Sequence, residues 1–157
     1  MRPANPVRRR RALAAGASLL ALAAVGACSS GSGHSAAELK VSGAYIPQPA
    51  LADMAAGYFT VTNTGGTDAT LTSVTSGFAA SITMHSTTDG RMRTADSFDV
   101  PAGGKLVLSL GGNHLMLMDL KRKPLAGEKV SLKLHFRDAD PITVPVPVKP
   151  AGYQPGK

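Results

Sequence analysis

Beyond residue 38 the hydrophobic positions of the chain follow the pattern of short β-strands. The alternation is cleanest at 130–136, where Val130, Leu132 and Leu134 are separated by polar residues. Successive side chains of a strand point to opposite faces, so a period of two indicates a strand with one buried face. Comparable short runs occupy 39–45, 56–62, 70–75, 80–85, 105–110, 114–120 and 142–148. Glycine, proline and asparagine separate these runs, and no segment after the first 27 residues keeps a helical period, so the pattern predicts an all-β sandwich.

The last run, 142–148, repeats the alternation with Val144 and Val146 on one face. Pro145 and Pro147 fall on the opposite face. Proline has no N–H to donate to a neighbouring strand and is confined to sheet edges and strand ends. We therefore expect this strand to lie at a sheet edge.

The first 27 residues have the composition of an export signal. Arg8–Arg11 are basic, and 12–24 is an apolar run that is shorter than the roughly 20 residues a membrane span needs. The following Val-Gly-Ala-Cys at 25–28 resembles the lipobox of bacterial lipoproteins, in which the cysteine is lipidated and begins the mature chain. We therefore expect lipidation at Cys28 and a lipid anchor on the outer face of the plasma membrane. An ordinary secretory signal, and export by either the Sec or the twin-arginine pathway, remain open.

The chain divides into four segments. A lipoprotein signal at 1–27 is followed by a Ser/Gly tether at 28–37, a folded domain at 38–148 and a tail at 149–157. The tether contains His34, which we interpret as a spacer residue. The tail is rich in proline and glycine, so we expect it to be disordered.

The charge and the cysteine content exclude several classes of function. The net charge is +7, but five arginines lie in the signal, so the mature chain would carry +2 and gives no indication of nucleic-acid binding. The basic run at 121–123 is interpreted as a solvated turn. Cys28 is the only cysteine, so the chain can form no internal disulfide and no blue-copper site, which requires a thiolate. No catalytic nucleophile, acid pair or cofactor loop is evident, so we do not expect an enzyme.

Four side chains in this domain could bind a soft metal ion. His85 is followed after six residues by Met92, and after twenty-one more by His114, with Met116 two positions later. Residues i and i+2 of a strand point to the same side about 6.6 Å apart, so His114 and Met116 project together. Asp-Gly between His85 and Met92 predicts a hairpin that brings these two back near each other. Two imidazoles and two thioethers suit copper(I) and match zinc or magnesium poorly.

Other methionines and histidines have simpler interpretations. Met84 and Met118 are expected to fill the core, although Met118 shares a face with Met116 and is a reserve ligand. Met54, in the loop before the run at 56–62, is a weaker candidate ligand. His135 lies on the polar face of its strand and is expected to be a solvated surface residue.

This array resembles that of the PCu(A)C-type extracytoplasmic copper chaperones. The family pattern is a histidine, then a methionine, twenty-one residues and His-x-Met, which Met92, His114 and Met116 match. The segments 55–63 and 101–104 resemble its early strand and one of its later turns. The family usually has ten residues between the first histidine and the methionine, where this chain has six, so His85 departs from the pattern.

The resemblance implies a fold and a function. The fold would be a cupredoxin-like or Ig-like antiparallel Greek-key β-sandwich. It would bind one copper(I) with His85, Met92, His114 and Met116 and deliver it, as a monomer, for assembly of the copper A site of cytochrome c oxidase. The recipient would be a copper-accepting oxidase subunit or an oxidase-assembly protein. Cell-surface copper storage, and a structural lipoprotein whose sandwich binds another protein, remain as alternatives.

Overall fold

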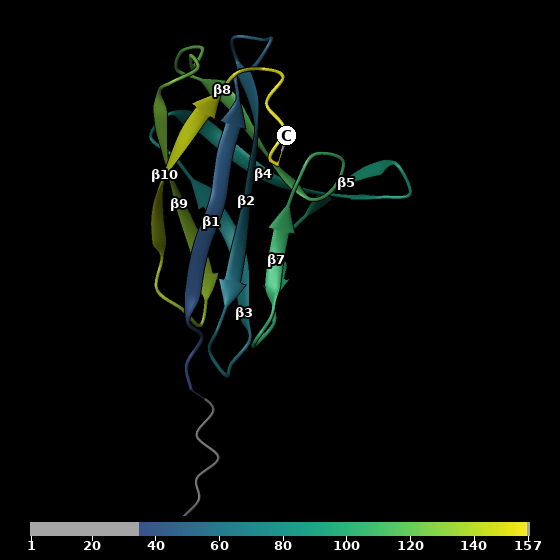
Figure 1. The fold of residues 1–157 in the computed structure, drawn as a ribbon, viewed down its shortest axis with the longest axis vertical. Coiled ribbons are helices and arrows are strands. Elements are labelled where there is room, and N and C mark those ends of the chain that lie inside the picture. The colour runs from purple at the N-terminus through teal and green to yellow at the C-terminus, as the bar shows by residue number, and fades with distance from the viewer. Residues whose placement is uncertain (1–34, 157) are drawn as a thin grey trace, which may run out of the picture. The chain divides into compact units, whose positions relative to one another are not determined.

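The computed structural model describes residues 35–156, which form a β-sandwich without helices (Figure 1). The predicted signal, Cys28 and His34 therefore lie outside the described residues. Within that range there are ten strands: β1 (Leu39–Pro47), β2 (Met54–Asn63), β3 (Ala69–Thr75), β4 (Ala79–Thr88), β5 (Arg91–Ala95), β6 (Phe98–Val100), β7 (Lys105–Leu108), β8 (His114–Leu120), β9 (Lys129–Arg137) and β10 (Ile142–Lys149). Over the same range, no helix is long and apolar enough to cross a membrane.

The strands form two layers that β1 joins. One layer has the order β5-β4-β8-β2-β1, with β7 paired to β2 beyond the end of β8, and the other has the order β10-β9-β3-β6. Connections such as β2–β3 and β8–β9 pass from one layer to the other, as in Greek-key sandwiches. The expectation of purely antiparallel pairing is wrong at one place, because β1 and β10 pair in parallel through Ile46 and Pro47.

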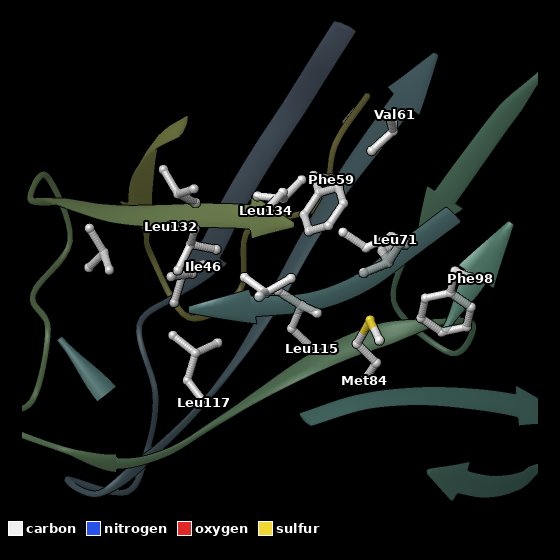
Figure 2. Packing of buried hydrophobic residues seen from close by; sticks show 14 of the residues in the cluster. Ile46, Phe59, Val61, Leu71, Met84, Phe98, Leu115, Leu117, Leu132 and Leu134 are labelled. Atoms are coloured by element: carbon white, nitrogen blue, oxygen red, sulfur yellow. The ribbon is translucent and has the colours of Figure 1, made fainter. Parts of the chain in front are cut away.

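The core lies between the two layers and is built by the period-two pattern of the strands. Leu115 and Leu117 of β8 are fully buried and face Leu132 and Leu134 of β9, as Figure 2 shows. Burying a leucine stabilises the fold by about 1.5–3 kcal/mol, so this pattern anchors each strand by one face. The opposite face of β8 is thereby left pointing outward.

Most predicted strands are confirmed to within a few residues, and three features differ. β6 was not expected, because three residues are too few for a periodic pattern. β10 is an edge strand for most of its length, as its prolines predict, but Val148 pairs with β1. Residues 150–156, for which we expected disorder, form turns, and the Tyr153 ring packs 5.1 Å from that of Tyr45.

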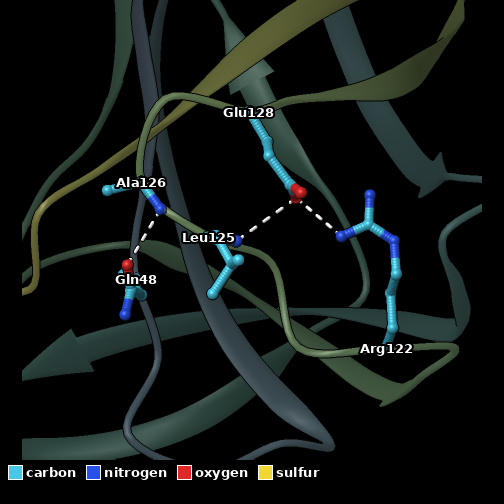
Figure 3. Close-up of polar contacts among 5 residues, drawn as sticks. All are labelled: Gln48, Arg122, Leu125, Ala126 and Glu128. Atoms are coloured by element: carbon cyan, nitrogen blue, oxygen red, sulfur yellow. Dashed lines mark hydrogen bonds and ion pairs between the residues drawn. The ribbon is translucent and has the colours of Figure 1, made fainter.

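The basic run at 121–123 lies in a loop that is tied to its surroundings rather than freely solvated. The Arg122 guanidinium donates to the Glu128 carboxylate at 2.6 Å, and the backbone N–H of Leu125 donates to the same carboxylate (Figure 3). The Arg122 hydrogen bond is the first cause that holds the pKa of Glu128 below its usual value. The Ala126 N–H donates to Gln48 at 2.8 Å, which joins this loop to the β1–β2 loop.

Asn63 holds together the end of the sandwich where the described chain begins. Its side chain is fully buried, and its amide oxygen accepts hydrogen bonds from the N–H groups of Glu38 and Gly65 at 3.1 and 3.0 Å. Its amide nitrogen donates to the carbonyls of Thr67 and Val100 at 2.8 and 3.1 Å. A Cβ at Gly65 would lie 2.0 Å from a backbone oxygen of residue 36, so only glycine fits this corner.

We expect Asn63→Ala to lower the free energy of unfolding by about 2–4 kcal/mol, because it leaves several buried backbone groups without partners. Urea denaturation followed by circular dichroism measures this. The neighbouring Thr64→Ala is the control, since Thr64 is exposed and its side chain makes only a 3.5 Å hydrogen bond to the Glu38 carbonyl. Equal effects of the two substitutions would show that Asn63 does not hold this corner.

Candidate metal centre

The outer face of β8 carries the side chains that could bind a metal. His114, Met116 and Met118 alternate with the buried Leu115 and Leu117 and are each partly exposed. The outer face of a sheet in a sandwich is ordinarily polar. An imidazole and two thioethers in these positions are therefore not needed for packing.

The pairing of β4 with β8 brings the two predicted histidines together. His85 lies directly opposite His114 in the antiparallel register, and Thr83 lies opposite Met116. The two imidazole rings have centroids 5.5 Å apart and are inclined by only 14°. Three of the four predicted ligands thus occupy adjacent positions on one sheet face.

The hydrogen bonds of the two imidazoles leave one nitrogen of each available. His114 Nδ1 lies 2.9 Å from the Gly112 carbonyl oxygen, so it donates a proton there and leaves Nε2 as an acceptor. His85 Nε2 lies 2.9 Å from the Thr83 hydroxyl, while His85 Nδ1 is buried and has no hydrogen-bond partner. Leaving a buried polar atom unpaired costs about 1–3 kcal/mol, which a bound ligand would recover.

These hydrogen-bond partners were not identified from the sequence, although one could have been. Thr83 is two residues before His85 and so had to share its face once β4 was recognised. The Gly112 carbonyl could not have been found, because its direction depends on the turn between β7 and β8. A backbone carbonyl that accepts from a metal-binding histidine fixes the tautomer and orientation of the ring.

The environment of His85 favours the neutral form of its imidazole. Burial, followed by the proximity of His114, lowers the pKa of His85 from its usual value. A neutral imidazole has a free lone pair and can bind a metal without first losing a proton.

Met92 lies on the same face but further from the histidines. The β4–β5 hairpin turns at Asp89 and Gly90, whose φ angles of 51° and 71° are those of a two-residue hairpin turn. This register places Met92 opposite Thr87, which is two residues beyond His85 on the same face of β4. The hairpin projects to one side of the sandwich (Figure 1), and the Met92 side chain is 58% exposed. Met92 is thus the least constrained of the four predicted ligands.

The remaining methionines and His135 divide between the core and the surface. Met84 is buried in the core, as expected. The expectation that Met118 fills the core is wrong, because the register of β8 places it outside with Met116. Met54 opens β2 and lies directly opposite Met118. His135 faces outward in the other layer, as expected, and its Nε2 lies 2.9 Å from the Thr75 hydroxyl.

An apolar groove adjoins this face. It encloses about 410 Å³ and is lined by Met54 and Met116 together with the rings of Tyr45, Tyr58 and Tyr153. Burial is the main cause that raises the pKa of Tyr45 and Tyr58, and nearby phenols raise it further, so both stay uncharged. The sulfur-bearing side chains therefore border an uncharged surface. Among residues 35–156, no group of three or more histidine, cysteine or acidic side chains is placed to hold a metal ion.

Comparison with known sequences identifies the family. The sequence model of the family described as "Putative lipoprotein LpqE-like" matches residues 39–148. A protein from Leifsonia xyli subsp. xyli, named "Putative lipoprotein Lxx21020", is 39% identical over 122 residues, which are 74% of this chain and 73% of that protein.

Comparison with solved structures identifies the fold. The apo PCuAC domain of PmoF2 superposes with a TM-score of 0.65 over 76% of this chain and 97% of that domain, at 20% identity. The solution structure of copper(I)-bound DR1885 from Deinococcus radiodurans superposes with a TM-score of 0.59 over 76% of this chain and 83% of that protein, at 26% identity. The expected cupredoxin-like β-sandwich and the resemblance to the PCu(A)C type are thereby confirmed. The chain belongs to the LpqE-like lipoprotein family and has the fold of a PCuAC domain.

Proposed function

We propose that this protein binds one copper(I) ion through His85, His114, Met116 and Met92 and delivers it to an acceptor, without catalysing a reaction. The unpartnered Nδ1 of His85, beside the imidazole of His114, is the observation that carries the proposal. When Nε2 of His85 donates to the Thr83 hydroxyl, Nδ1 carries a lone pair that no atom of the described chain uses. The similarity to DR1885, whose solved structure contains copper(I), supports the same ion.

The donor set accounts for the choice of ion. Thioether sulfur is a soft ligand that selects copper(I), and imidazole is a good ligand for copper. Thioethers and imidazoles also avoid the oxidation to disulfides that paired thiolates undergo outside the cytoplasm. Two nearly parallel rings cannot both hold one ion in their planes, so binding would rotate one imidazole. Both histidines are partly exposed, which leaves room for that rotation.

The exposure of Met92 supports a role in transfer. His114 and Met116 belong to a strand that is anchored in the core, whereas Met92 lies 58% exposed near the end of a projecting hairpin. An incoming ligand from an acceptor can replace the most accessible and least constrained donor first. The ion would then pass between the two proteins by successive ligand exchange, without release into solution.

The acceptor we propose is an oxidase subunit or an oxidase-assembly protein that forms the copper A site of cytochrome c oxidase. Storage of copper at the cell surface is the alternative, and it would need the same ligands but no recipient. Mixing the copper(I)-loaded protein with an apo copper A domain and separating the two distinguishes these roles. Copper should appear on the acceptor faster than a chelator of matched affinity removes it, and equal rates would favour storage.

We also propose that the protein works as a lipid-anchored monomer outside the cytoplasm. The family and the Leifsonia xyli relative both carry the name lipoprotein, and the 25–28 segment resembles a lipobox. In the described domain, the chain enters at Ser35, which accepts hydrogen bonds from Gly66 and Thr67 beside the β2–β3 turn. A tether from Cys28 would therefore end near Ser35.

A competition titration of the full-length protein should show one tightly bound copper(I), with sulfur and nitrogen scatterers in the X-ray absorption spectrum. His114→Ala and Met116→Ala should weaken binding by more than the 10–100-fold that loss of an outer hydrogen-bond partner typically costs, because both lie on the core-anchored strand. Met92→Leu should weaken it least of the four. His135→Ala is the control and should change nothing, since His135 lies in the other layer. A spectrum without sulfur would contradict the assignment.

The affinity should depend on pH through the imidazoles alone. An unperturbed imidazole has a pKa of about 6.5, and that of His85 is lowered, so His85 is neutral at and above this pH. Affinity should thus be nearly constant from pH 7.5 to about 6.5 and fall at lower pH as protons compete with copper. Titrations at several pH values measure this. A flat profile down to about pH 5 would show that neither histidine is a ligand.

Cys28→Ser should abolish lipidation but leave copper(I) affinity unchanged, because no disulfide depends on this cysteine. Anchoring raises the local concentration of a carrier near its acceptor, so the variant should supply copper poorly in cells and normally in solution. Labelling with a fatty-acid analogue followed by fractionation is the measurement. Unlabelled wild-type protein in the soluble fraction would refute the lipobox assignment and leave the copper proposal standing.

A further inference from the structure

Three methionines share the outer face of the sheet next to the proposed copper site. Met54 of β2 lies directly opposite Met118 of β8, and Met116 is two residues along β8 on the same side. All three are partly exposed, and none belongs to the core cluster. Packing therefore does not explain why methionine occupies these positions, whereas the buried Met84 on the other side of β4 is an ordinary core residue.

The register places the three side chains within reach of one another. Directly opposed residues of an antiparallel pair have Cβ atoms about 4.5–5.5 Å apart, and diagonal neighbours lie about 7–8 Å apart. Met54 and Met118 are an opposed pair, and Met54 and Met116 are a diagonal pair that lines the same groove. Methionine has three rotatable side-chain bonds, so sulfur atoms at these spacings can converge on one ion.

The surroundings suit a soft monovalent cation. The neighbours of the three methionines across the strands of this face are Ala56 and Thr83, opposite Met116, and Ser81, opposite Met118. None of the three is charged, so no basic side chain at these register positions repels a cation. The groove that Met54 and Met116 line contains no charged side chain. Three thioethers without a carboxylate or thiolate form a donor set that selects copper(I) over harder ions.

We propose that Met54, Met116 and Met118 form a second, all-thioether copper(I) site that shares Met116 with the His/Met site. Met116 belongs to both sites, and His114 is two residues from it on the same face of β8. An ion held by the three methionines therefore has only a short distance to move to reach His114. The methionine site would thus serve as the entry position, from which the ion passes to the tighter His/Met site. This inference rests on the proposed function, because it assigns the path by which that site is loaded.

The test uses the full-length protein with the double substitution H85A/H114A, which removes both imidazoles and leaves all three methionines. Copper(I) should still bind, more weakly than to the wild type. Because thioethers carry no proton to lose, this residual binding should be unchanged between pH 7.5 and 5. Carbon-13 labelling of the methionine methyl groups should show the resonances of Met54, Met116 and Met118 shifting together.

Adding M54L/M118L to that variant should reduce the residual affinity for copper(I) about tenfold or more. Loss of a residue that only hydrogen-bonds to a metal ligand already lowers affinity by about this factor, and loss of a ligand should lower it at least as much. M84L in the same background is the matched control and should have no effect, because Met84 is buried on the other face. M54L/M118L in the otherwise wild-type protein should slow the loading of copper(I). No residual binding in H85A/H114A, or residual binding insensitive to M54L/M118L, would overturn the methionine site. Absence of copper(I) binding by the wild type would instead overturn the proposed function.

Discussion

The antiparallel pairing of β4 with β8 is the constraint on which the candidate metal centre depends. It fixes His85 opposite His114 and brings together residues that are 29 positions apart in the sequence. A slip of one residue would turn the side chains of one strand to the other face, and the buried leucines of β8 would then be exposed to water. The core and the candidate site are therefore held by the same register.

One face of β8 packs in the core, and the other face carries residues of the candidate metal centre. Leu115 and Leu117 are fully buried and fix the strand in the sandwich, while His114 and Met116 point outward from the same rigid backbone. The Gly112 carbonyl then orients the His114 ring from the turn that precedes the strand. Side chains that are held in this way, such as His114 and Met116, need little reorganisation when a metal binds. This preorganisation favours a high affinity for the metal.

The sequence predicted the fold and the residues of the candidate site better than it predicted how the side chains of that site are arranged. Period-two alternation identified the strands and showed that His114 and Met116 share a face, because that follows from backbone geometry alone. The same alternation placed Met118 on the face of Met116, but the expectation that Met118 fills the core followed the hydrophobicity of methionine instead, and that expectation was wrong. The unpaired Nδ1 of His85 depends on strands that are distant in sequence, and no local pattern contains that information.

The register of the β4–β5 hairpin decides on which face of the sheet Met92 lies. Six residues separate His85 from Met92. Met92 pairs with Thr87, which is two residues from His85 on β4, so Met92 lies on the face that carries His85. The hairpin ends in the tight turn at Asp89 and Gly90, which begins four residues beyond His85. A loss of one residue with the same turn would have placed Met92 on the opposite face, where no other proposed ligand lies.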